Sequence, residues 1–165
     1  MGEKTSKPTI TFGIDPDTEK SGLAILKDGE LAVSTLPFPQ LVETIIIKAR
    51  QWESEGYEVQ VICEAGYINH AHWHILPKDT KAIAAAKGNA AGRNHEVARK
   101  IIEMLEHHHI TTHAVKPLRK QWKGHDRKIT HEELCNVCRT AKVTFSAKRS
   151  NQEERDAALL SIVYG

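Results

Sequence analysis

Residues 9–36, TITFGIDPDTEKSGLAILKDGELAVSTL, contain three short apolar runs separated by polar turns. Each run has the length and the Val, Ile, Leu and Thr content of a β-strand. We expect strands over residues 8–15, 21–27 and 30–36. The Asp28-Gly29 pair predicts a hairpin turn between the last two strands, because these residues accept the positive φ angles that such turns require. The stretch therefore predicts a meander of three strands.

The rest of the chain alternates between helical and extended patterns. Apolar residues recur at helical spacing in five segments. We expect helices over residues 39–55, 80–108, 117–122, 130–141 and 152–163. We expect two further strands over residues 58–64 and 110–115. A meander followed by alternating helices and strands predicts an α/β domain with one mixed five-stranded sheet and helices on both faces.

The composition is typical of one globular domain. The chain has 165 residues, of which 40% are hydrophobic and 27% are charged. We expect a flexible N-terminus at residues 1–8 and a single domain over residues 9–165. No apolar run approaches the roughly 20 residues that span a bilayer, and the polar N-terminus lacks a signal-peptide pattern. Three unevenly spaced cysteines do not suggest a disulfide framework, so we expect a cytoplasmic protein that does not associate with membranes.

The charges are unevenly distributed along the chain. The formal net charge is +2, but residues 114–150 contain ten Lys or Arg residues against three acidic ones. Such a segment is a candidate phosphate-binding surface, although a solvated loop with ordinary lysines has the same composition. The candidate contacts to nucleic acid in this segment are Lys116, Arg119, Lys120, Lys123, Arg127 and Lys128.

Two of the expected strands end on an acidic residue. Asp15 precedes Pro16 at the end of the first strand, and Glu64 ends the strand over residues 58–64. In open α/β sheets, ligands bind at the carboxyl ends of strands. If these two strands are neighbours, Asp15 and Glu64 meet at that edge. The structural alternatives are that Asp15 initiates a turn with Pro16 and that Glu64 caps a strand at the surface.

The last expected helix contains two further acidic candidates. Asp156 directly precedes residues 157–163, a run with almost no polar face, and aspartate is seldom fully buried without a partner. Glu153 lies three residues earlier, on the same face of a helix. Two capping boxes fit the start of this helix equally well: Ser150 with Glu153, and Asn151 with Glu154.

Four carboxylates predict a site for a divalent cation. Clustered acids repel one another unless a cation neutralises them, and oxygen ligands suit Mg²⁺ or Mn²⁺ better than zinc. Two such ions can activate a water molecule and stabilise the leaving oxygen in phosphodiester hydrolysis. An acidic cluster near a basic segment therefore indicates a nuclease.

The ordered set of motifs resembles RuvC-type Holliday-junction resolvases, which have an RNase H-like fold. The resemblance runs from about residue 9 to residue 165. It rests on Gly13-Ile14-Asp15-Pro16, Ser21-Gly22-Leu23-Ala24, Glu64-Ala65-Gly66-Tyr67, Gly88 with Gly92, Gly124 with Lys128, and Glu153 with Asp156. The chain departs from the family pattern at Asp17, Ala65, Ala91 and Glu153, where the family usually has Gly, Gln, a basic residue and Asp.

The resemblance implies an endonuclease for branched DNA that depends on Mg²⁺, with Mn²⁺ as a substitute, and that acts as a homodimer. The metal ligands that it implies are Asp15, Glu64, Glu153 and Asp156. Lys128 would contact DNA near the scissile phosphate, and Tyr67 would stack on an unpaired base. Arg93 stands close to the position where Ala91 replaces the family's basic residue.

Other functions remain open on the sequence. They include a non-catalytic nucleic-acid-binding protein of the same fold and a nuclease for another structured DNA or an RNA–DNA hybrid. A kinase or ATPase of the sugar-kinase type would need two such domains, which 165 residues do not supply. A zinc module could use Cys135 and Cys138 together with histidines of the chain, but one CxxC pair is weak evidence. The histidines considered are His70, His72, His74 and His131.

Overall fold

The protein forms one mixed five-stranded sheet in a computed structural model that describes residues 5–69 and 76–165. The strands are β1 (Thr9–Asp15), β2 (Ser21–Lys27), β3 (Glu30–Leu36), β4 (Glu58–Glu64) and β5 (Thr112–Val115). Their spatial order is β3-β2-β1-β4-β5. β2 runs antiparallel to β1 and β3, whereas β1, β4 and β5 are parallel. This is the mixed five-stranded sheet that we expected.

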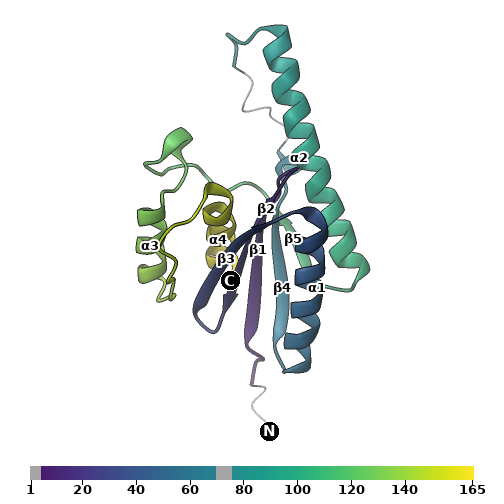
Figure 1. The fold of residues 1–165 in the computed structure, drawn as a ribbon, viewed down its shortest axis with the longest axis vertical. Helices are drawn as coiled ribbons and strands as arrows, with labels where there is room; N and C mark the ends of the chain where they lie inside the picture. Colours follow the sequence, from purple (N-terminus) through teal and green to yellow (C-terminus); the bar gives the residue numbers. More distant parts are fainter. Residues whose placement is uncertain (1–4, 70–75) are drawn as a thin grey trace.

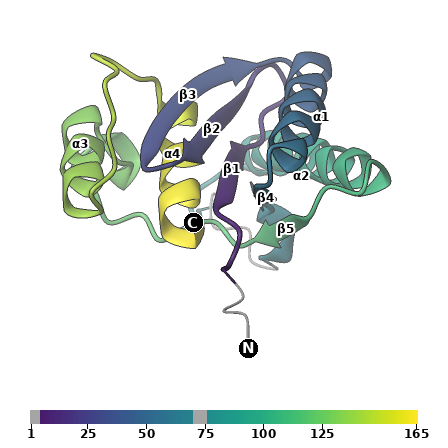
Figure 2. The ribbon, with the colours of Figure 1, turned by 90° about the horizontal axis from the view of Figure 1, so that it is seen from below.

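Helices cover both faces of the sheet. They are α1 (Phe38–Ser54), α2 (Lys81–His107), α3 (His131–Thr140) and α4 (Gln152–Tyr164), with short 3-10 turns η1 (Gly66–Ile68) and η2 (His125–Arg127). Figures 1 and 2 show α1 and α2 on one face, α4 on the other, and α3 outside α4. In Figure 1, α2 extends well beyond the end of the sheet.

The alternation of side chains along β1 and β4 decides which way the two acidic residues face. Ile10, Phe12 and Ile14 of β1 belong to the apolar core beneath α1 and α2, together with every second residue of β4 up to Cys63. Successive side chains of a strand point to opposite faces. The residues that follow, Asp15 and Glu64, therefore face α4. Since Ile14 pairs with Cys63, these two acids are also neighbours across the sheet.

Two glycines allow α4 to approach the sheet closely. A Cβ atom added at Gly13 would lie 2.1 Å from the carbonyl oxygen of Ala157, and one added at Gly22 would lie 2.0 Å from that of Glu153. No side chain can occupy these positions, because both neighbours are backbone atoms. The missing side chains bring the first turns of α4 directly over the ends of β1 and β2.

Most of the expected elements form within one or two residues of their predicted bounds. The turn between β2 and β3 has positive φ angles at Asp28 (51°) and Gly29 (75°), as predicted for a hairpin. None of the helices in the described ranges is long and apolar enough to cross a membrane. The candidate zinc ligands His70, His72 and His74 lie outside the described residues.

The prediction of a helix over residues 117–122 is wrong. This segment is irregular and folds back on itself through hydrogen bonds from the Trp122 amide to the Arg127 carbonyl and from the Gly124 amide to the Lys128 carbonyl. The apolar residues that suggested a helix, Leu118 and Trp122, pack instead against the core between the sheet, α3 and α4. Their spacing reflected this burial and not a helical backbone.

Candidate metal and nucleic-acid site

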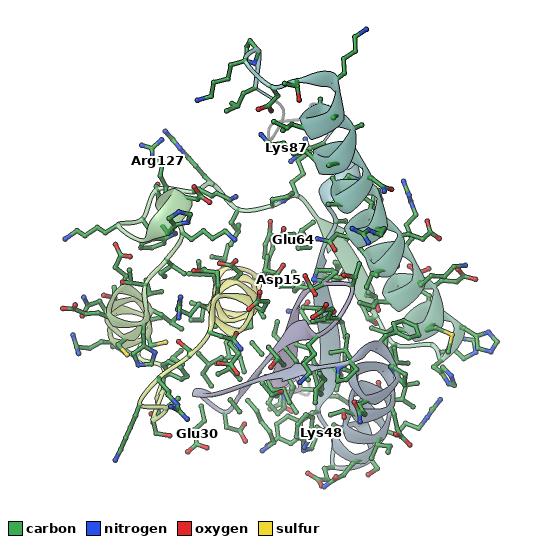
Figure 3. The ribbon with its side chains drawn as sticks, turned by 45° about the horizontal axis from the view of Figure 1, so that its top comes forward. Asp15, Glu30, Lys48, Glu64, Lys87 and Arg127 are labelled. Atoms are coloured by element: carbon green, nitrogen blue, oxygen red, sulfur yellow. The ribbon has the colours of Figure 1, made fainter. Side chains whose placement is uncertain are left out.

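The four acidic candidates line one cleft of about 260 Å³ at the carboxyl end of β1 and β4. Asp15 and Glu64 come from the strands, and Glu153 and Asp156 come from the first turns of α4. Figure 3 shows Asp15 and Glu64 close together near the start of α4. The other residues that line the cleft are Pro16, Asp17, Asn94, Pro117, Leu118, Arg119, Lys120, Trp122, Lys128, Ile129 and Leu159.

The capping of α4 leaves Glu153 available to the cleft. The side chain of Asn151 accepts a hydrogen bond from the Glu154 amide at 2.8 Å, and Glu154 accepts one from the Asn151 amide at 3.0 Å. This is the second of the two capping boxes that the sequence allowed. Glu153 therefore has no part in the cap, and its side chain lines the cleft.

The environment of the cleft disfavours ionisation of its carboxyl groups. Burial, followed by the negative charges of Glu64, Asp156 and Glu153, raises the pKa of Asp15 well above its ordinary value. Burial and the charge of Asp156 raise the pKa of Glu64 to about 7. Burial also raises the pKa of Asp156, although Gln152 and three basic residues oppose the shift. These acids repel one another at neutral pH unless a cation joins them.

Two lysines supply positive charge to the cleft. Lys120 and Lys128 both line it, and both lower the pKa of Glu64 and of Asp156 against the effect of burial. Lys128 also lowers the pKa of Asp15. Lys120 is exposed and Lys128 is half-buried. Because neither side chain is fully buried, a phosphate bound beside the carboxylates could contact both of them.

Asp156 is held by a relay of side chains on α4. Its Oδ1 atom accepts a hydrogen bond from Gln152 Nε2 at 2.8 Å, and Gln152 Oε1 accepts one from Arg155 Nη2 at 3.1 Å. Arg155 Nε in turn donates to the Ile129 carbonyl at 2.9 Å. Arg155 thus joins the Asp156 side of the cleft to the segment that carries Lys128.

The donor set fits a divalent cation that prefers oxygen ligands. Among the described residues, five acidic side chains line the cleft, the four candidates and Asp17, and no thiol or imidazole does. The raised pKa values indicate negative charge that the protein alone does not neutralise. Within residues 5–69 and 76–165, however, no group of three or more acidic, His or Cys side chains is already arranged to hold an ion. The carboxylates share a cleft, and Asp156 can keep its hydrogen bond from Gln152 at Oδ1 while Oδ2 faces an ion.

The remaining sequence candidates lie around the cleft. Arg119 lines it. The residues that are exposed outside it are Arg93, Lys116, Lys123 and Arg127. Tyr67 lies on η1, where the Arg99 guanidinium sits 4.4 Å from the centre of its ring and His95 packs edge-on at 6.4 Å. Arg99 therefore covers one face of the Tyr67 ring, and the side chain also packs against the apolar core beneath α1 and α2.

Several residues of the site were missed by the sequence analysis. Asn94 of α2 lines the cleft, and Gln152 with Arg155 holds Asp156. The sequence did contain a signal for the contact between Gln152 and Asp156, because residues four apart on a helix are neighbours. Nothing in the sequence indicated Asn94, because its place depends on how α2 crosses the sheet.

A larger but shallower hollow of about 440 Å³ lies over α3. Its one ionisable residue is Glu133, whose carboxylate already caps the helix by accepting from the Thr130 amide at 3.0 Å. The zinc hypothesis gains no support in the described ranges, where no three-ligand group is found. Cys138 is buried, and Cys135 contacts His131.

Comparisons with known proteins find similarity in structure only. No family model matches the chain, and no curated protein matches it. A structure of T. thermophilus RuvC in complex with Holliday junction substrate is 12% identical, with a TM-score of 0.49, over 93% of this chain and 90% of that chain. A second Thermus thermophilus RuvC structure is 16% identical, with a TM-score of 0.40, over 93% of this chain and 91% of that chain.

Proposed function

We propose that this protein is a divalent-metal-dependent endonuclease that cleaves branched DNA, with the Holliday junction as the first substrate to test. The observation that carries the proposal is the convergence of Asp15, Glu64, Glu153 and Asp156 in one cleft. Three of these acids have raised pKa values, which is common at functional sites. The choice of a junction follows the sequence resemblance.

The carboxylates would bind Mg²⁺, with Mn²⁺ as a substitute. Bound in the cleft, such ions supply an activated water molecule and neutralise charge on the scissile phosphate. Asp15 and Glu64 offer their oxygens from rigid strand ends, and Glu153 and Asp156 offer theirs from the start of α4. Rigid supports of this kind keep ligands near the geometry that catalysis needs.

The basic residues would hold the DNA backbone. Lys128 is half-buried and its charge acts on Asp15, so it would donate a hydrogen bond to a phosphate oxygen near the carboxylates. Lys120 and Arg119 line the same cleft and extend this positive surface outward. The resemblance further implies a homodimer, in which two clefts would cut a junction symmetrically.

The first experiment is a cleavage assay with Mg²⁺ or Mn²⁺ on a four-way junction, a fork, a linear duplex and an RNA–DNA hybrid. Asp15→Asn and Asp156→Asn should each lower cleavage by about 100-fold or more, because each removes a metal ligand, while DNA binding is retained. The matched control is Glu154→Gln, which changes an acid of the same helical turn and keeps the capping box.

Each pattern of cleavage decides a different part of the proposal. Paired symmetric nicks in the junction alone support a dimeric resolvase. Cleavage of other substrates retains the nuclease but rejects the junction as its specific substrate. DNA binding without metal-dependent cleavage of any substrate overturns the nuclease and favours a non-catalytic binding protein of the same fold.

A further inference from the structure

A thiol, an imidazole and a hydroxyl group lie in a row between α3 and the start of α4. Cys135 Sγ lies 3.5 Å from His131 Nε2, and His131 Nδ1 lies 2.7 Å from Ser150 Oγ. The first two residues are four apart on α3, so the helix itself holds them together. A nucleophile that contacts a base, with the base oriented by a third group, is the arrangement that activates a nucleophile.

Of the three cysteines of the chain, Cys135 is the accessible one. Cys63 and Cys138 are buried, whereas Cys135 and His131 are each half-buried. The His131 ring also packs against Phe145 at 5.7 Å between centres, which restricts its rotation. A small reagent can therefore reach a thiol that has a fixed base beside it.

We propose that Cys135 is an oxidation site that reacts with hydroperoxides to form a sulfenic acid, with His131 as its base and Ser150 as a positioning residue, and that this oxidation lowers the activity of the carboxylate cleft. The thiol chemistry stands independently of the nuclease. The control of cleavage rests on the proposed function.

The reaction balances with a hydroperoxide as the oxidant. Nε2 of His131 takes the thiol proton while Nδ1–H donates to Ser150 Oγ, and the Cys135 thiolate attacks one oxygen of the peroxide. An S–O bond forms and the O–O bond breaks. The leaving oxygen takes a proton from the imidazolium, giving water or an alcohol. The sulfur loses two electrons and the peroxide gains them.

A continuous series of hydrogen bonds joins this site to the cleft. Arg155 Nη1 donates to the carbonyl oxygen of Ser150, and its Nη2 donates to Gln152, which holds Asp156. An oxygen added to Cys135 Sγ on the side of His131 would disturb the contact with Nε2. A displaced His131 would pull on Ser150, and through Arg155 and Gln152 on Asp156.

The chemistry is tested by measuring labelling with iodoacetamide and trapping of sulfenic acid with a 1,3-dione after peroxide treatment, by mass spectrometry near pH 7. A Cys138→Ala background removes the thiol three residues away that could condense with the product. We expect modification at Cys135, and a rate about tenfold lower in His131→Gln, since an unassisted thiol is only a few per cent thiolate at this pH.

The positioning role of Ser150 needs a separate comparison. Ser150→Ala should slow labelling and Ser150→Thr should restore it, because only the hydroxyl is required and the backbone contact with Arg155 is kept in both. Equal labelling rates in the original background, His131→Gln and Ser150→Ala would overturn the activated thiol.

The control of the cleft is tested by cleavage in the Cys138→Ala protein before and after peroxide, and again after a thiol reductant. We expect a loss of cleavage that the reductant reverses, and no loss in a Cys135→Ser version. If Cys135 is fully trapped as a sulfenic acid and cleavage is unchanged, the proposed regulation of cleavage is overturned but the oxidation site is not. If the untreated protein does not cleave DNA, the proposed nuclease function and its regulation by oxidation are both overturned, while the labelling result at Cys135 stands.

Discussion

The carboxyl groups of the cleft are held where their ionisation is unfavourable. Glu64 ends a buried strand and faces Asp15 and the first turns of α4, and burial is the largest cause of the raised pKa of both acids. Residues selected for catalysis or metal binding often destabilise the fold that carries them. In this protein the same burial that would strengthen binding of a cation makes the metal-free carboxylates repel one another.

The residue-scale prediction concerns stability without metal. The pKa of Glu64 rises from 4.5 to about 7 on folding, so the folded protein binds more protons than the unfolded chain between these values. Its stability therefore falls as pH rises from about 4.5 to about 7 and remains low above that range. Glu64→Gln removes this charge and should raise stability at pH 8 by about 1 kcal/mol or more, which is about 3 °C in Tm for a chain of this size.

Thermal unfolding in EDTA at pH 4.5 and at pH 8 measures this effect. The gain in Glu64→Gln should be small at pH 4.5 and larger at pH 8. Glu154→Gln, an exchange at the cap of α4, serves as the control and should show no such difference. A Glu64→Gln protein whose Tm follows the wild type at both pH values would contradict the raised pKa.

At the scale of secondary structure elements, the site depends on how α4 rests on the sheet. The face of the sheet beneath α4 presents Gly13, Gly22 and Ala24, and α4 presents Ala157 and Ala158 to it. Small residues on both sides bring the backbones together, so the position of Glu153 follows from the space that Gly22 leaves. The opposite face, beneath α1 and α2, is filled with large apolar side chains.

Gly22→Ala should displace the first turn of α4 and destabilise the protein by about 1–3 kcal/mol, the usual range for overpacking. Its added Cβ would lie 2.0 Å from a backbone oxygen that cannot move alone. The matched control is Gly88→Ala on α2, where nothing lies within 4 Å of an added Cβ and alanine should stabilise the helix by about 1 kcal/mol. Urea unfolding compares the two. Equal stabilities would show that α4 does not need the glycine.

Across the whole molecule, the cleft is the place where acidic and basic side chains meet at one end of the sheet. The carboxylates lie at one end of the sheet with Lys120 and Lys128 beside them, and Figure 3 shows Lys48 toward the other end of the molecule. A polyanion would be attracted to the end of the molecule that carries Lys120 and Lys128. Its phosphates could then replace the carboxylates as the partners of these two lysines. Positive charge at the cleft thus provides both binding and orientation.

DNA binding by the Asp156→Asn protein should depend steeply on salt. Lys120→Ala and Lys128→Ala should each weaken binding and lower the slope of log K against log salt concentration by about 1, because each removes one phosphate contact. Lys48→Ala should leave both quantities unchanged. Fluorescence anisotropy with a labelled four-way junction at several salt concentrations measures these slopes. If Lys120→Ala and Lys128→Ala show the same slope of log K against log salt concentration as Lys48→Ala, these two lysines do not contact the DNA.

The sequence alone predicted most of the local structure, and the metal chemistry that it indicates for the site stays a prediction. The alternation in residues 9–36, the Asp28-Gly29 turn and the acids at strand ends are short-range patterns, and short-range patterns are set by backbone sterics and by which face is apolar. The sequence also groups Asp15, Glu64, Glu153 and Asp156 in one hypothetical metal site. Their convergence in one cleft agrees with that hypothesis.

The tertiary structure alone decided what depends on packing between distant segments. It selected the Asn151–Glu154 capping box, and it turned residues 117–122 into an irregular wall of the cleft. It also brought Cys135, His131 and Ser150 into one row. The physical reason is that these outcomes depend on which surfaces are buried against each other, and burial is a property of the folded chain that no local stretch contains.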